Sequence, residues 1–108
     1  MLIDKSTNQE LEKKGDLYQY DFGARKQNSR VVATMIIKGS DIKTVTATAD
    51  CSCTSTSPNV IDKDTVEIDI IYKSTHLIHN INREVFVNYS ENGENKLDKI
   101  KITGQIIK

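Results

Sequence analysis

The sequence predicts an all-β fold, an antiparallel β-sandwich of about seven strands with a short N-terminal arm. Its 108 residues include 14 Ile, 7 Val and 10 Thr but only 5 Leu, and branched side chains fit a pleated sheet better than a helix. Several segments alternate apolar and polar side chains with a period of two, and turn-forming residues separate them. This length allows one domain with one core. A single closed barrel is the alternative arrangement.

Residues 1–16 are mostly polar, and we expect them to form an arm or a short helix ahead of a β domain at residues 17–108. The helix-compatible part begins at Asn8, which can cap a helix, and its acidic residues precede its lysines. Gly15 then ends it. A helix this short is marginal in isolation, so one docked turn and a flexible arm both remain open.

The first three predicted strands precede the cysteine-containing segment. Residues 17–22 alternate and end at Gly23. Residues 31–37 are apolar enough for a central strand, and residues 38–41 supply the turn that follows. Residues 42–49 begin a face of small or branched side chains. That face consists of Val45, Ala47, Ala49 and, beyond the strand, Cys51.

Three more strands are predicted after a turn-prone segment at residues 55–59. Residues 65–73 alternate most sharply. Their inward side chains are expected to be Val66, Ile68, Ile70 and Tyr72. Residues 84–89 repeat the pattern, and Asn-Gly at residues 92–93 predicts a tight hairpin, because both central residues of that turn need positive φ. Residues 97–107 form the last strand. Its apolar face is Ile100, Ile102 and Ile106.

The formal charges balance, with 15 basic and 15 acidic side chains. Such a balance predicts no general attraction for nucleic acids or anionic membranes. Only three of the basic residues are Arg, which disfavours bidentate phosphate recognition. No apolar run approaches the roughly 20 residues of a membrane span. The N-terminus lacks the apolar segment of a secretory signal, and Met1 favours a chain that stays where it is made.

The candidate metal ligands are Cys51, Cys53, His76 and His79, since zinc takes Cys and His ligands. Against such a site, one residue between cysteines is a tighter gap than the usual two to four. The sequence instead predicts reduced thiols, one of them packed in the core, and two solvated loop histidines, with no bound metal and no cofactor. A reactive thiol needs a nearby cation or a helix N-terminus, whereas the neighbouring Asp50 disfavours a thiolate.

No catalytic constellation and no phosphate-binding loop is recognisable, so the sequence predicts neither an enzyme nor a small-molecule substrate. One charge pattern concerns the last strand. Lys99, Lys101 and Lys108 are expected on its outer face, where they would protect a sheet edge from unwanted pairing. The alternative is a docking face for an acidic partner.

Several short motifs follow one another through the predicted β domain. They are Tyr20-Asp21-Phe22-Gly23, Lys38-Gly39, Cys51-Ser52-Cys53-Thr54, Tyr72-Lys73-Ser74, Phe86-Val87-Asn88-Tyr89-Ser90 and Ile100-Lys101-Ile102-Thr103-Gly104-Gln105-Ile106. In this order they resemble the bacterial domain of unknown function called DUF1573, which belongs with the immunoglobulin-like modules of the ASPM–SPD-2–Hydin group. The resemblance runs from about Tyr20 to Ile107. It implies an immunoglobulin-like sandwich without assigned catalytic residues.

The sequence departs from the pattern of that family at three places. Ser52 stands where the family usually has Gly between the cysteines. Gly39-Ser40-Asp41 replaces its Asn-x-Gly turn, and Asp62-Lys63-Asp64 replaces its Pro-Gly-rich turn. These departures concern the subfamily and not the fold. The family usually follows a secretion signal, whereas isolated domains without leaders resemble those that decorate the heads, necks and tails of phage particles.

These observations predict a non-enzymatic structural or interaction module, specifically a bacteriophage virion component made in the bacterial cytoplasm. The expected partners are other virion subunits in a multi-copy assembly. A periplasmic or cell-surface binding module is the first alternative. A small Cys/His metal-binding protein is the second.

Overall fold

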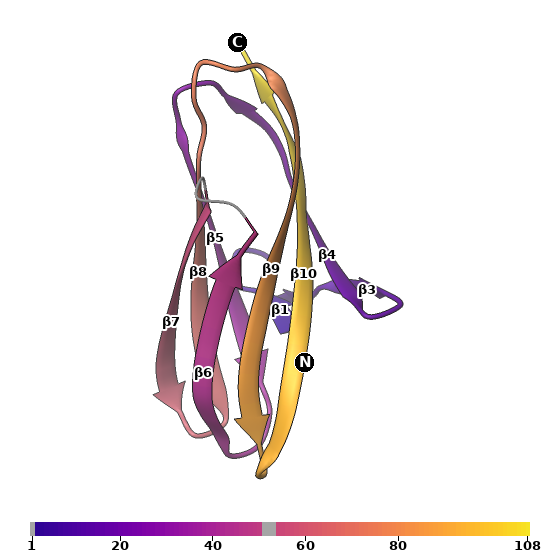
Figure 1. Ribbon diagram of the computed structural model, residues 1–108, viewed down its shortest axis with the longest axis vertical. Coiled ribbons are helices and arrows are strands. Elements are labelled where there is room, and N and C mark those ends of the chain that lie inside the picture. The colour runs from indigo at the N-terminus through magenta and orange to yellow at the C-terminus, as the bar shows by residue number, and fades with distance from the viewer. Residues whose placement is uncertain (1, 51–53) are drawn as a thin grey trace.

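The computed structural model describes residues 2–50 and 54–108, which form two five-stranded β-sheets packed face to face, with no helix in these ranges (Figure 1). One sheet has the order β2-β1-β5-β8-β7 and the other β3-β4-β10-β9-β6. The strands are β1 (Leu2–Asp4), β2 (Gln9–Glu10), β3 (Glu12–Lys14), β4 (Leu17–Lys26), β5 (Arg30–Lys38), β6 (Ile42–Ala49), β7 (Thr54–Asp62), β8 (Thr65–Lys73), β9 (His79–Glu91) and β10 (Glu94–Ile107). The predicted all-β sandwich is confirmed.

The core lies between the two sheets and consists largely of side chains that alternate with a period of two, joined by Leu2 from the segment expected to be an arm. The predicted apolar face of β8 is buried, and so is the predicted apolar face of β10. Interlocking branched side chains fill this layer, and burying each one contributes roughly 1.5–3 kcal/mol. The largest fully buried side chains are Leu2, Met35, Ile37, Val66, Ile68, Val85, Val87, Ile100 and Ile106.

The hairpin between β9 and β10 turns where the Asn-Gly pair predicted it. Asn92 and Gly93 have φ angles of 51° and 81°, the positive values that this two-residue turn requires. Glu91 and Glu94 pair directly on either side. The turn therefore sets the register of the longest strand pair in the molecule.

The strands are not all antiparallel, which corrects the expectation from sequence. β4 runs parallel to β10, from Leu17 opposite Lys99 to Lys26 opposite Ile107. The pairing shifts by one residue near Gly104, where β10 passes close to the ring of Phe22. Alternation of side chains does not encode strand direction, so the sequence could not reveal this pair.

The segment expected to be a turn at residues 55–59 is part of strand β7. Turn-forming Ser, Pro and Asn residues are tolerated there because β7 is an edge strand. Pro58 lies opposite Ile68 and has no amide hydrogen to offer an incoming strand. The Thr56 hydroxyl donates a hydrogen bond to the Ala47 carbonyl on β6 at 2.9 Å, so the two edge strands on this side cover each other.

The helix-compatible segment at residues 8–14 forms β2 and β3 instead of a helix. Asn8 has a φ of 56° and Gly15 a φ of 62°, so both residues reverse the chain. Leu2 is fully buried opposite Ile37 on β5. β1 and β2 thus extend one sheet and β3 extends the other, so residues 2–14 contribute strands to both sheets.

β10 is not an edge strand, which corrects the role expected for its lysines. It lies between β4 and β9, so Lys99 and Lys101 cannot protect an edge. The Lys99 ammonium lies 3.3 Å from the Asp16 carboxylate in the turn before β4. Lys108 follows the end of the strand and is exposed.

Candidate functional site

A cleft of about 310 Å³ opens on the flank of the sandwich, between the β1–β2 turn and the two strands β4 and β5. It is lined by Asp4, Lys5, Ser6, Tyr20, Val32, Ala33 and Thr34. The turn is fixed by its own hydrogen bonds. Asp4 accepts bonds from the backbone and the hydroxyl of Ser6, at 3.0 and 2.8 Å. The Lys5 amide donates to the Thr34 carbonyl at 3.0 Å.

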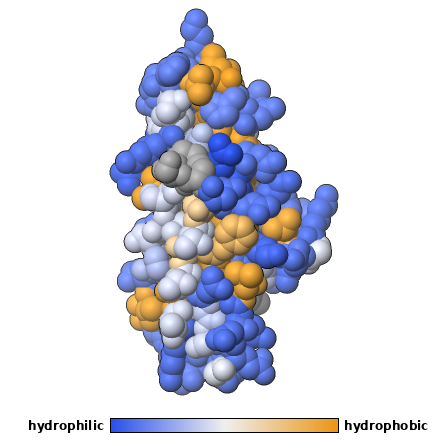
Figure 2. All heavy atoms as spheres, in the orientation of Figure 1, coloured by the Kyte–Doolittle hydropathy of each residue, from blue (hydrophilic) through white to orange (hydrophobic). Residues whose placement is uncertain are grey.

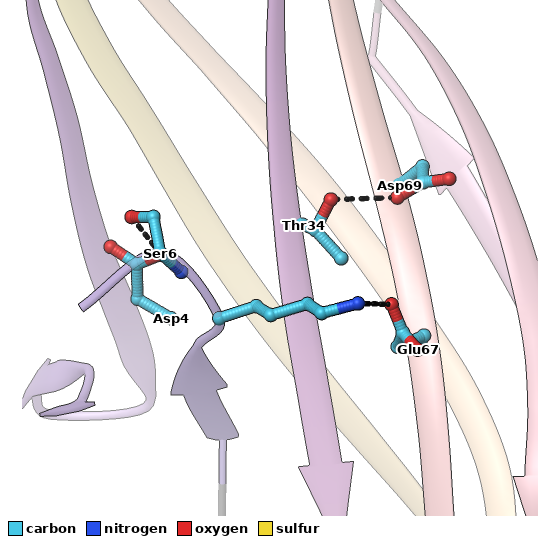
Figure 3. Close-up of polar contacts among 6 residues, drawn as sticks. Asp4, Ser6, Thr34, Glu67 and Asp69 are labelled. Atoms are coloured by element: carbon cyan, nitrogen blue, oxygen red, sulfur yellow. Dashed lines mark hydrogen bonds and ion pairs between the residues drawn. The ribbon is translucent and has the colours of Figure 1, made fainter. Parts of the chain in front are cut away.

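Two polar contacts continue from this cleft across the outer face of β5 and β8 (Figure 3). The Lys5 ammonium lies 2.7 Å from the Glu67 carboxylate. The Thr34 hydroxyl donates to Asp69 at 2.8 Å. The hydrogen bond to Glu67 raises the pKa of Lys5, so this amine stays protonated and is a poor nucleophile or base. The Lys5–Glu67 pair holds the β1–β2 turn against the sheet, and the Thr34–Asp69 bond joins β5 to β8.

The two histidines of the metal hypothesis lie at the β8–β9 connection. The His76 carbonyl accepts a bond from the Gln27 side chain at 2.8 Å. The ring of His79 lies 3.5 Å from the Tyr72 hydroxyl through Nε2 and 3.2 Å from the Leu77 carbonyl through Nδ1.

Cys51 and Cys53 lie outside the residues that the structure describes. Within residues 2–50 and 54–108, no group of three or more His, Cys, Asp or Glu side chains is placed to hold a metal ion. The four-residue metal site therefore remains a hypothesis.

A buried phenol lies at the interface of β9 and β10. The Tyr89 hydroxyl donates a hydrogen bond to the Asp98 carboxylate at 2.9 Å. Burial, and next this hydrogen bond, raise the pKa of Tyr89 well above its usual value. The folded state therefore favours the neutral phenol, while the unfolded chain loses this proton near pH 10.

The stability that neutral Tyr89 contributes is accordingly expected to be fully present below about pH 10 and to decline above it. The Tyr89→Phe variant should lose less stability between about pH 8 and pH 11 than the parent chain does. Urea unfolding at the two pH values measures both declines. A matched control is Tyr18→Phe, because burial also raises the pKa of Tyr18 but its phenol makes no hydrogen bond to a carboxylate. Equal declines in the parent and the Tyr89 variant would contradict the prediction.

Sequence reasoning missed one surface, which lies where β10 ends. The turn at residues 26–30 and the turn at residues 74–78 are bonded together there: the Asn28 amide donates to the Thr75 carbonyl, and the Ser74 amide to the Ser29 carbonyl, both at 2.9 Å. The Gln27 amide donates to the Ile107 carbonyl at 2.7 Å. We call residues 25–30, 73–80 and 105–108 the basic end.

The basic end combines cations with aliphatic side chains. Its exposed basic residues are Arg25, Lys26, Arg30, Lys73 and Lys108. Its exposed large aliphatic residues are Leu77, Ile78 and Ile107. Figure 2 shows hydrophobic and hydrophilic spheres side by side at this end of the molecule. The signal was present in the sequence, because residues 22–40, 70–83 and 99–108 contain no Asp or Glu.

Comparison with known proteins gives no match: no family model matches the chain, and no curated protein or solved structure does so at a significant level. The resemblance to DUF1573 remains a prediction from the motifs. Among the described residues there is also no helix that is long and apolar enough to cross a membrane.

Proposed function

We propose that this protein is a non-enzymatic, immunoglobulin-like module that acts through protein–protein contacts as a structural component of a bacteriophage virion. The observation that carries the proposal is the order of the strands. Immunoglobulin constant-type domains place strands A, B, E and D in one sheet and C, F and G in the other. In this chain β1, β5, β8 and β7 follow the first order, and β6, β9 and β10 follow the second.

The remaining strands extend this plan without changing it. β4 is added beside β10, while β2 and β3 are short and lie at the far edges of the two sheets. On the opposite side, Pro58 and the bond from Thr56 to Ala47 limit strand addition at β7 and β6. We therefore assign the contacts with neighbouring subunits to side-chain surfaces and not to strand exchange.

The polar groups of the flank cleft support a structural role as well. The Lys5–Glu67 pair links the β1–β2 turn to β8, and the Thr34–Asp69 bond joins the neighbouring strands β5 and β8 of the same sheet. Both contacts join segments more than thirty residues apart in sequence. An array subunit benefits from a first segment that is fastened in this way, because its surfaces then keep a fixed geometry.

The test is the location of the protein. Phage particles induced from the source strain and purified on a density gradient are probed with an antibody against the recombinant chain. We expect the protein to sediment with intact particles and to stay with them after a high-salt wash. A host enzyme of similar abundance serves as the control for trapped cell protein. Recovery of the chain only in the particle-free fractions would overturn the proposal.

A further inference from the structure

We infer that the basic end is a docking surface for an anionic phospholipid bilayer. The proposal concerns a surface beyond the proposed protein–protein role and does not depend on it. Its first premise is segregation of charge. A formally neutral chain places five basic side chains and no acidic side chain in residues 25–30, 73–80 and 105–108.

These cations are available to a partner. All five of these side chains are exposed, and none takes part in the ion pairs found among the described residues, which use Lys5, Lys43, Lys96 and Lys99. The opposite end differs. There the Ile42 amide bonds to the Lys63 carbonyl and the Asn92 amide to the Asp41 carbonyl, and residues 38–43, 62–64 and 91–96 mix five acidic with four basic side chains.

The second premise is that exposed aliphatic side chains lie at the same end of the molecule as these cations. Leu77 and Ile78 are adjacent in the β8–β9 connection and are 57% and 58% exposed. Ile107 is also exposed, and the bond from Gln27 to its carbonyl brings it to the same end. The adjacent pair Leu77 and Ile78 exposes apolar surface that a binding partner can bury.

An anionic bilayer complements both premises. Its headgroups attract basic side chains at about one kcal per mole each, or about fivefold in binding for each residue, and its acyl boundary accepts aliphatic side chains without a matching cavity. A nucleic acid would engage the same cations but leave the aliphatic side chains in water, and none of the exposed large hydrophobic residues is aromatic and able to stack on bases. An acidic protein would need a matching apolar surface.

The geometry also orients the molecule. The chain is a rod with extents of 46 × 23 × 22 Å, and the basic end lies at one end of its long axis, where β10 and the C-terminus finish (Figure 1). Docking through this end would set the sandwich upright on the bilayer. The mixed-charge end would then point away from it.

The experiment is sedimentation of the full chain with phosphatidylcholine vesicles that contain about 30% phosphatidylglycerol. We expect binding at low salt that declines toward about 0.5 M salt, and none to phosphatidylcholine alone. The double variant Arg25→Gln/Lys26→Gln should bind about 25-fold more weakly. The matched control Lys43→Gln/Lys63→Gln, which removes the same charge at the opposite end, should bind as the parent does. Leu77→Ser/Ile78→Ser should also weaken binding.

A site-specific reporter completes the test, because the chain contains no tryptophan. The fluorescence of a Leu77→Trp variant should shift to shorter wavelength on adding the anionic vesicles, whereas that of a Val60→Trp variant should not. The inference is overturned if the parent chain does not bind at low salt, if both charge variants lose binding equally, or if the reporter at position 77 does not respond. Binding to polyglutamate but not to the vesicles would assign this end to an acidic protein and would equally overturn it.

Discussion

Replacing Leu2 by Ala is expected to lower the free energy of unfolding by about 2–5 kcal/mol. Leu2 is fully buried and lies opposite Ile37 in the pairing of β1 with β5. Truncation would leave a cavity between the sheets and weaken the attachment of β1. The Leu2 carbonyl also accepts a hydrogen bond from the Leu11 amide at 2.9 Å. The destabilisation would therefore extend to Leu11, which connects β2 to β3.

Urea unfolding of the parent protein and of the Leu2→Ala variant measures this difference in the free energy of unfolding. The matched control is Leu77→Ala, which removes the same atoms from an exposed position and should change stability by no more than about 0.5 kcal/mol. If Leu2→Ala were as mild as the control, residues 2–14 would be a loosely attached arm, and the description of β1 as an integral strand would be wrong.

Replacing Gly104 by Ala is expected to destabilise the protein by about 1–3 kcal/mol. A Cβ at this position would overlap the ring of Phe22. The ring cannot move freely, because it is buried and stacks on Tyr72 with a centroid separation of 6.1 Å. Gly104 therefore allows the close approach of β10 to β4 at the shift in their parallel pairing.

The second variant in this test is Phe22→Leu, which shortens the side chain that the new methyl group meets. In that background, Gly104→Ala should cost clearly less than in the parent chain. Gln105→Ala, a substitution at the exposed neighbouring residue, is the surface control. Equal costs of Gly104→Ala in the two backgrounds would show that the ring contact is not the cause.

The sequence predicted the parts of the fold that depend on local alternation. Val66, Ile68 and Ile70 are buried as their spacing required, and the turn at residues 92–93 formed where Asn-Gly demanded positive φ. These features follow from side-chain period and backbone sterics, which a few neighbouring residues determine.

The errors arose where distant segments decide the outcome. Residues 8–14 have a helical composition, but a helix this short is marginal. Residues 12–14 instead pair with β4, and the preceding residues 2–4 pair with β5. Residues 55–59 contain turn formers, yet an edge strand beside β8 tolerates them. The parallel pairing of β4 with β10 depends on topology alone.

The candidate surface was hidden for a similar reason. The net charge of the whole chain is zero. The fold nevertheless brings together, at the basic end, three segments that contain no acidic residue. Seeing the basic end requires the bonds that join the turns at residues 26–30 and 74–78. The expectation of no attraction to nucleic acids or anionic membranes rests on that net charge, and the vesicle experiment tests it.

Amide hydrogen exchange measured by NMR tests the central structural claim most directly, which is that the first strands belong to the folded sandwich. The Lys5 amide bonds to the Thr34 carbonyl at 3.0 Å, and the Leu11 amide to the Leu2 carbonyl at 2.9 Å. Both should exchange with opening free energies within about 1 kcal/mol of those in β5 and β8. Exchange of these two amides at unprotected rates, while β5 and β8 stay protected, would contradict the account.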